Sequence, residues 1–430
     1  MPRKIESAAI ATNVPPLIRK NTIYVAVVLS LQGLGGQLAV TMGALMVIHL
    51  LGRMTLVGIG GSILGVGRML MSYPMGKLTD ARGRKLGMAI ALGMSLIGGG
   101  LLGGSMAFSS FPIFVVGMVA LGLGAGSARQ LSVAAVDMYP SARRAEGLGY
   151  VLTASIGSAI IAPLIIWTGE AVANSWGGNP LGASWYLMLV ALVPTMLFIR
   201  MIRPDPKSIA LNLGQYWPGY KPILSKAGAV QPSSISKFLS HRPKRIAYIC
   251  YAAAQGTMSL MMIMTPVVLS ESGHTISFIS VAVSIHVLGM FAFSIPLGKL
   301  ADRIGRKSLI GVGLIIEGAG AFLVPVTPSY AITTIGLFLI GVGWSAVNIS
   351  VTALLADTTE PEERGRAIGL NETLSGLLSV VMPFIGGFIV ELAGLITVSI
   401  FGGCVVIVAI VQMLGLREYK GGQFKDYSYG

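Results

Sequence analysis

The sequence predicts an all-α integral membrane protein with twelve transmembrane helices in two six-helix repeats and both termini in the cytoplasm. Three observations predict this fold class: an apolar composition, a one-sided distribution of basic residues, and an internal repeat. Of the 430 residues, 53% are hydrophobic and only 11% are charged, whereas soluble domains carry about 25% charged residues. The mean hydropathy is +0.77. This composition argues against a soluble enzyme and favours a chain surrounded by lipid.

Twelve apolar segments are long enough to cross a bilayer, which requires roughly 20 residues for a core of about 30 Å. They lie at residues 23–51, 55–75, 86–108, 112–136, 148–170, 183–202, 246–270, 275–297, 308–327, 329–355, 367–391 and 394–416. Between the sixth and seventh segments the chain is polar and rich in Pro, Lys and Ser. We therefore expect an N-terminal bundle (1–202), a cytoplasmic linker (203–245), a C-terminal bundle (246–416) and a cytoplasmic tail (417–430).

The basic residues gather on one side of this arrangement. Of the 31 lysines and arginines, 28 fall in the tails, in the central polar segment, or in loops on the same side as these, and the opposite loops carry only Arg53. Because basic loops stay in the cytoplasm, both termini should be cytoplasmic. Membrane topology then explains the net charge of +14 without a nucleic-acid partner. We expect a multi-pass protein of the bacterial cytoplasmic (inner) membrane or of a membrane derived from it.

The two halves repeat one another in register. The segment PMGKLTDARGRK at 74–85 recurs as PLGKLADRIGRK at 296–307, a constant offset of 222 residues. At an offset of 220, Asp137 and Arg144 correspond to Asp357 and Arg364. The repeat indicates a duplicated six-helix unit.

The loop pattern G-x-L-x-D-x-x-G-R-K, present in both halves, resembles the hallmark loop of the major facilitator superfamily. This resemblance implies that substrate binds between the two halves near the bilayer midplane, in a cavity lined by the first, second, fourth and fifth helices of each half, and that the halves rock in alternating access. It implies gating roles for Gly76, Asp80, Arg84, Gly298, Asp302, Arg303 and Arg306. A second set of charge contacts is implied for Asp137, Arg144, Asp357 and Arg364. The alternative is that the basic members only determine topology.

Ionisable residues inside the spans are candidates for function, because charges in a bilayer are costly. Arg68 and Arg129 have no counterparts in the second half, so the duplication does not explain them, and Arg129 resembles an arginine of the family's fourth helix. Both could also reach the headgroups or bond to the backbone. The full set of candidates for substrate binding or coupling is Arg68, Arg129, Gln37, His286 and Asn348. Glu372 is a gating candidate that could instead form a structural ion pair.

The leading functional hypothesis is a secondary active transporter, coupled to protons, for an organic anion or a metal chelate bearing carboxylates. The two arginines favour an anionic substrate. The first span has Gln37 but no acid, which argues against a cationic one. One alternative is multidrug-type efflux of amphiphilic compounds. Another is a transport-inactive membrane receptor or assembly protein on the same fold. The sequence does not distinguish import from export.

The sequence offers little for other chemistry. It has two cysteines in separate apolar runs, no ATP-binding loop, and no cluster of nucleophile, base and acid. We therefore expect no enzyme activity, no cofactor and no bound metal. The expected partners are a small-molecule substrate, protons and the lipid bilayer, and we expect a monomer.

Overall fold

The computed structural model describes residues 13–140, 143–218, 235–326, 329–359 and 364–418. These residues form helices and connecting turns, with no strand among them. The first part contains α1 (Pro16–Leu51), η1 (Met54–Leu56), α2 (Ile59–Arg82), α3 (Arg84–Ala107), α4 (Phe111–Asp137), α5 (Arg144–Ala154), α6 (Ile156–Trp176) and α7 (Pro180–Met201). Three short helices follow: α8 (Pro206–Leu211), α9 (Leu213–Tyr216) and α10 (Ile235–Ser240). The last part contains α11 (Arg242–Glu271), α12 (Ile276–Phe291), α13 (Ser294–Ile304), α14 (Arg306–Val326), α15 (Tyr330–Asp357) and α16 (Arg364–Leu414).

Within the described residues, ten helices are long and apolar enough to cross a membrane, and the bent pair of α12 and α13 makes an eleventh candidate. That pair bends by 41°. The element labelled α16 consists of two helices that meet at a kink at Gly394, whose φ of 78° and ψ of 174° are not helical. Its 51 residues would make roughly 75 Å of helix in total, more than twice the thickness of a bilayer core. Gly394 coincides with the predicted start of the last span.

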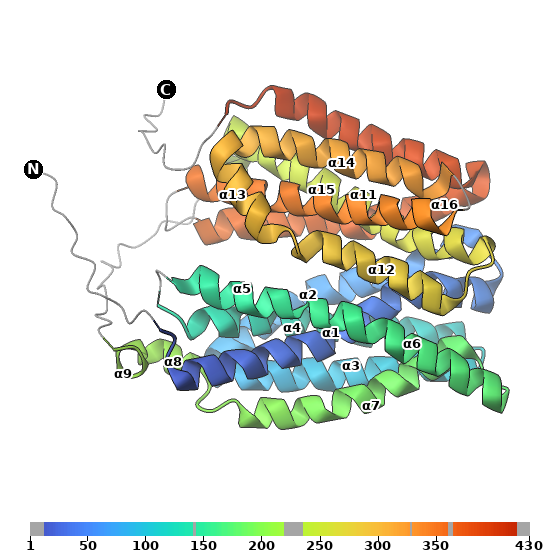
Figure 1. Ribbon diagram of the computed structural model, residues 1–430, viewed down its shortest axis with the longest axis horizontal. Coiled ribbons are helices and arrows are strands. Elements are labelled where there is room, and N and C mark those ends of the chain that lie inside the picture. The colour runs from blue at the N-terminus through green and yellow to red at the C-terminus, as the bar shows by residue number, and fades with distance from the viewer. Residues whose placement is uncertain (1–12, 141–142, 219–234, 327–328, 360–363, 419–430) are drawn as a thin grey trace, which may run out of the picture.

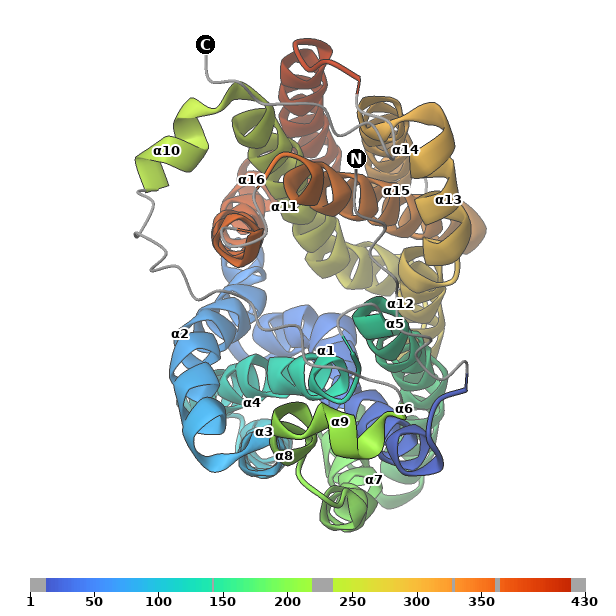
Figure 2. The same cartoon turned by 90° about the vertical axis from the view of Figure 1, so that its left-hand side faces the viewer.

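The helices form two groups that face each other. In Figure 2 the blue-to-green helices α1 to α7 form the lower group and the yellow-to-red helices α11 to α16 form the upper one. The first group packs around buried side chains such as Leu38, Trp185 and Met188. The second has its own buried side chains, including Tyr248 and Leu354. A third cluster joins the two groups, because Ala44 and Val57 of the first pack with residues such as Leu260 of the second.

Close helix packing depends on glycine where backbones approach each other. A Cβ atom added to Gly122 in α4 would lie 2.5 Å from the carbonyl oxygen of Leu64 in α2. In the second group, a Cβ added to Gly320 of α14 would lie 2.6 Å from the carbonyl oxygen of Gly336 in α15. The glycine-rich composition therefore serves close contact between helices.

The start of the polar segment expected as a linker is folded against the first group of helices. Trp217, which follows α9, is fully buried, and its indole Nε1 donates a hydrogen bond to the carbonyl oxygen of Met138 at 2.9 Å. Its ring lies 5.5 Å from that of Tyr139, and the guanidinium of Arg143 lies 5.0 Å from its centroid. An indole buries a large apolar area, so Trp217 anchors α8 and α9 to the end of the molecule shown at the left of Figure 1.

Candidate substrate cavity and charged gates

A cavity of about 530 Å³ lies between the two groups of helices. From the first group, α1, α2, α4 and the junction of α5 with α6 contribute to its wall; from the second, α11, α12 and α16 do so. This matches the helices that the sequence analysis expected, except that α15 supplies no residue to the described lining. A volume of this size accommodates a small organic molecule.

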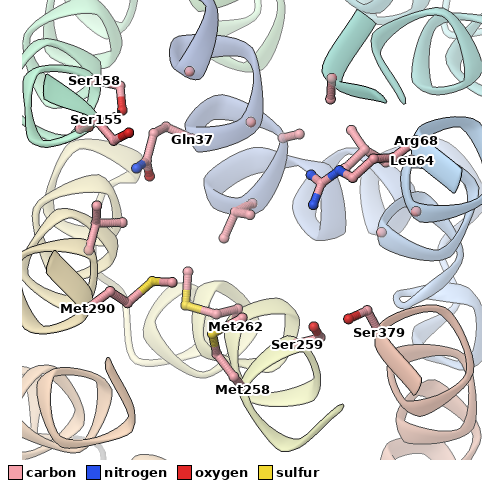
Figure 3. Close-up of a pocket in the computed structure, with 18 of the residues that line it drawn as sticks. Gln37, Leu64, Arg68, Ser155, Ser158, Met258, Ser259, Met262, Met290 and Ser379 are labelled. Atoms are coloured by element: carbon pink, nitrogen blue, oxygen red, sulfur yellow. Dashed lines mark hydrogen bonds between the residues drawn. The ribbon is translucent and has the colours of Figure 1, made fainter. Parts of the chain in front are cut away.

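Polar side chains concentrate on the wall formed by the first group. Arg68 of α2 extends its guanidinium into the cavity, with Gln37 of α1, Ser155 and Ser158 on the same half (Figure 3). On the other half, Ser259 of α11 and Ser379 of α16 supply hydroxyl groups. No aspartate or glutamate belongs to the lining among the residues that the structure describes. Arg68 is the residue of the described lining that carries a formal charge.

The facing wall adds deformable apolar side chains to these polar groups. The thioethers of Met258, Met262 and Met290 face the cavity (Figure 3). Methionine adapts its shape to a ligand better than branched side chains do. The cavity thus combines an arginine on one wall and hydrogen-bonding groups on both walls with a soft apolar surface on the second half.

Gln255, which lines the cavity, is held by a hydrogen bond from Trp344, which does not. The indole Nε1 of Trp344 on α15 donates to the Oε1 of Gln255 at 2.8 Å. The amide nitrogen of Gln255 lies 3.4 Å from the hydroxyl of Ser259. Trp344 thereby orients a lining amide through α15, the helix that does not itself reach the cavity.

The predicted substrate and coupling residues divide into three groups. Gln37, Arg68 and His286 line the cavity. His286 is 1% exposed, its Nδ1 lies 2.8 Å from the carbonyl oxygen of Leu337, and its Nε2 has no partner among the described residues. Asn348 is half-buried on α15, outside the lining. Arg129 belongs to α4, but its side chain lies outside the described part of the structure.

In the first half, the loop arginine Arg84 joins two carboxylates. Its Nη1 lies 2.7 Å from the Oδ1 of Asp80, and its Nε lies 2.7 Å from the Oδ2 of Asp137. The second half repeats this arrangement. Nη1 of Arg306 lies 2.7 Å from Asp302 and its Nε lies 3.1 Å from Asp357. In each half, the arginine of the repeated loop therefore joins its loop aspartate to the aspartate at the end of the fourth helix.

The other predicted gating residues lie near these clusters or outside the described side chains. Gly76 is in α2 and Gly298 is in α13, while Arg303 is exposed. Glu372 is half-buried in α16. The side chains of Arg144 and Arg364 lie outside the described part.

Two acids that the sequence analysis did not single out also hold the loops. The carboxylate of Asp205 accepts hydrogen bonds from the backbone N–H groups of Arg84 and Lys85, both at 3.0 Å. In the second half, Glu418 accepts from the backbone N–H groups of Lys307 at 2.9 Å and Ser308 at 3.1 Å. Each acid follows the last long helix of its half, so a weak signal was present: an acid shortly after the sixth and twelfth apolar segments.

Beside the first cluster, Arg143 binds Glu146 at the start of α5. The guanidinium Nε and Nη2 donate to the two carboxylate oxygens at 2.7 Å and 2.9 Å. These hydrogen bonds lower the pKa of the Glu146 carboxyl below its usual value.

The chain resembles known transporters over nearly its whole length. A model of the Major Facilitator Superfamily matches residues 246–425. The uncharacterized MFS-type transporter YdeG of Bacillus subtilis is 28% identical, over 93% of this chain and 92% of that protein. The chain is thus similar to major facilitator superfamily transporters, in its second half by the family model and over nearly its whole length by this relative. It is accordingly a multi-pass membrane transport protein.

Two further comparisons extend this similarity. The riboflavin transporter RfnT of Brucella anthropi is 23% identical, over 94% of this chain and 97% of that protein. Among solved structures, the inward-open xylose transporter XylE of E. coli superposes with a TM-score of 0.68 at 17% identity, covering 93% of this chain and 97% of XylE. The likeness to XylE shows the superfamily's fold. The members compared here are transporters rather than enzymes.

Proposed function

We propose that this protein is a secondary active transporter that moves an organic anion, or a metal chelate bearing carboxylates, by alternating access and with protons as the coupling ion. The observation that carries the proposal is Arg68 of the cavity wall, whose guanidinium extends into the cavity (Figure 3). A guanidinium binds a carboxylate through two parallel, charge-assisted hydrogen bonds. Arg129, also on a helix of this wall, is proposed to assist.

The proposal includes a topology. The chain crosses the bilayer twelve times, with α16 counted as two crossings that meet at Gly394 and α12 with α13 as one. Residues 1–202 and 246–416 are the two bundles, 203–245 link them, and 417–430 form a tail. Both termini are cytoplasmic, the membrane is the bacterial inner membrane, and the protein works as a monomer. The basic loops support this orientation.

The chemistry of the cavity narrows the substrate further. Hydroxyl and amide groups at Ser155, Ser158 and Gln37 suit a polar part, while Met258 and Met262 suit an apolar body. An amphiphilic organic anion fits both walls. A full-length relative named as a riboflavin transporter supports a small organic molecule as the substrate class.

Paired dyes of opposite charge test this function. The purified protein is reconstituted in liposomes with an imposed pH gradient, and movement of fluorescein, an anion, is compared with that of ethidium, a cation. We expect fluorescein to move faster. R68A should reduce that rate by roughly tenfold or more, since hydrogen bonds to charged groups contribute about 1.5–3 kcal/mol. The fluorescein rate of R68K should lie between those of the wild type and R68A, because lysine keeps the charge but lacks the planar, two-pronged guanidinium.

Arg200, an exposed residue of α7 outside the cavity, provides the matched control. R200A should leave the fluorescein rate unchanged. A fluorescein rate that R68A also leaves unchanged would remove Arg68 from the substrate site. Dye movement that is independent of the pH gradient would remove protons as the coupling ion.

The second candidate is efflux of amphiphilic drugs, and the methionine wall favours it. Faster movement of ethidium than of fluorescein would support that function. A protein that moves no solute under any gradient would instead support a receptor on this fold.

A further inference from the structure

The two halves are joined by carboxylates at the end of the molecule opposite the repeated loops. Glu170, near the end of α6, accepts hydrogen bonds from the backbone N–H groups of Ile276 at 2.9 Å and Ser277 at 3.2 Å, in the first turn of α12. The Ser277 hydroxyl also donates to this carboxylate. The helices α6 and α12 belong to different halves and lie side by side (Figure 1).

A second carboxylate makes a contact in the opposite direction. Glu391, in the first segment of α16, accepts a hydrogen bond from the backbone N–H of Thr55 in η1 at 2.6 Å. Here the acid comes from the second half and the N–H from the first.

The two contacts are counterparts under the internal repeat. Glu170 and Glu391 are 221 residues apart, and Thr55 and Ser277 are 222 residues apart, the offset of the repeated loops. Each half therefore supplies one acid from its fifth helix and one N–H at the start of its second. The duplication that produced the two halves accounts for both contacts at once.

Beside the Glu391 contact, the backbones of the two halves approach too closely to leave room for a side chain at two glycines. A Cβ atom added to Gly58 would lie 1.9 Å from the carbonyl oxygen of Pro383. One added to Gly387 would lie 2.4 Å from the carbonyl oxygen of Thr55. The acids thus act where the two halves are in direct contact, whereas Arg84 and Arg306 bind acids of their own halves.

We propose that Glu170 and Glu391 form a reciprocal latch, which holds this end of the transporter closed and must open in each transport cycle. The inference rests on the proposed alternating access. A carboxylate is suited to the task because its hydrogen bonds to N–H groups at a helix start are strengthened by the helix dipole. It is also well solvated once the halves separate, so the latch can break without leaving a buried charge. Glu170 and Glu391 are positioning residues of the transport cycle.

Distances between spin labels at the two ends of the molecule test the latch without any substrate. One label pair, at Asn174 and Ala393, reports on the latch end; the other, at Ala81 and Ile304, reports on the loop end. All four positions are exposed. The native cysteines are removed by C250A and C404S, and the protein is measured in lipid nanodiscs with and without E170Q, E391Q and the double substitution.

The expected result is reciprocal movement. The double variant should lengthen the distance at the latch end and shorten that at the loop end, raising the ratio of outward-open to inward-open molecules roughly tenfold, with each single variant giving a smaller shift. If the acids were needed only for stability, their substitution would broaden the distance distributions at both ends and shorten neither mean distance. E170A should shift the ratio at least as far as E170Q, because the amide oxygen of glutamine still accepts a hydrogen bond.

Glu271 at the end of α11 is the matched control, because this exposed acid takes part in no hydrogen bond or ion pair among the described residues. E271Q should leave both distances unchanged. Unchanged distances in the double latch variant would overturn the latch, even if fluorescein transport continues. Failure to move fluorescein, combined with shifted distances, would overturn the proposed substrate and leave the latch standing.

Discussion

Arg84 and Arg306 each hold two carboxylates that differ in exposure. The side chain of Asp80 is 68% exposed and that of Asp137 is 20% exposed. Asp302 and Asp357 show the same contrast, at 64% and 25%. Ion pairs in solvent contribute little to stability. The exposed acid of each loop is therefore better placed to exchange partners than to stabilise the fold.

We predict that D80N and D302N slow turnover more than they weaken solute binding, with losses of unfolding free energy below about 1 kcal/mol. Their effect should lie in the conformational change, because the exposed acids contribute little to the resting structure. Fluorescein uptake, fluorescein binding and thermal unfolding in detergent measure the three quantities. Unchanged turnover in both variants would leave the repeated loops as topology signals only.

The less exposed partners provide the comparison. D137N and D357N should lower the free energy of unfolding by about 1.5–3 kcal/mol, because each removes a charge-assisted hydrogen bond from a largely buried guanidinium. Thermal unfolding of the four variants, measured side by side, checks that D137N and D357N lose more stability than D80N and D302N. Equal losses for D80N and D137N would contradict it.

At this scale, sequence reasoning predicts the residues that a repeat or an intramembrane charge distinguishes. The loop arginines and aspartates, Arg68 and Gln37 were named in this way. It missed the contacts of Asp205, Glu418, Glu170 and Glu391 with N–H groups that are between 106 and 336 residues away. The position of Asp205 and Glu418 after the last apolar segment of each half is a weak signal, but no local pattern indicates which distant N–H group such an acid binds.

At the scale of helices, the starts of α3 and α14 show how a loop is fixed. Gly83 and Gly305, which precede these helices, have φ values of 100° and 103°, in the region that favours glycine. A Cβ atom at Gly83 would lie 2.8 Å from a carboxylate oxygen of Asp205, and one at Gly305 would lie 2.2 Å from a carboxylate oxygen of Glu418. The glycine thus allows the sharp turn and leaves room for the acid that caps the next helix.

We predict that D205A and E418A each lower the free energy of unfolding by about 1 kcal/mol, the usual effect of losing a side chain that caps a helix. Amide hydrogen exchange should accelerate at Arg84 and Lys85 in D205A, and at Lys307 and Ser308 in E418A. Each variant is the control for the other, since the two helix starts lie in different halves. Faster exchange at both helix starts in one variant would indicate general destabilisation instead.

The helix boundaries were only partly predictable. The sequence predicts one span over 275–297, and the structure divides it between α12 and α13 with a 41° bend. Pro296 cannot donate a hydrogen bond to the preceding turn. Yet Pro74, its counterpart in the first half, lies inside the unbroken α2. The same residue type therefore gives two outcomes, and the surrounding packing decides between them.

At the scale of the whole molecule, the repeat predicts two similar bundles with a cavity between them. It does not predict at which end the bundles touch, because both ends carry suitable groups. Nor does it predict that residues up to Trp217 fold onto the first bundle. A polar composition indicated a linker, but the buried side chains of Ile209, Leu213 and Trp217 hold the start of it against the bundle.

We predict that reporters of membrane sidedness fused after Lys20, inserted after Ala227, and fused at Gly430 all report the cytoplasm, because the basic residues fall on one side. The insertion avoids the part of the polar segment that Trp217 anchors. A reporter placed after Arg53 gives the opposite reading as a control. An external reading at any of the three would contradict the twelve-span topology.

The methionine wall of the cavity has a consequence for oxidative chemistry. Met258, Met262 and Met290 present their sulfur atoms to the cavity that is proposed to hold the solute. Peroxide or hypochlorite that enters with water converts a thioether to a sulfoxide, which is polar and no longer suits an apolar ligand. A bound solute would shield these sulfur atoms. The transporter is thus most vulnerable to oxidants when its solute is scarce, and its recovery then depends on methionine sulfoxide reductases reaching a cavity within the membrane.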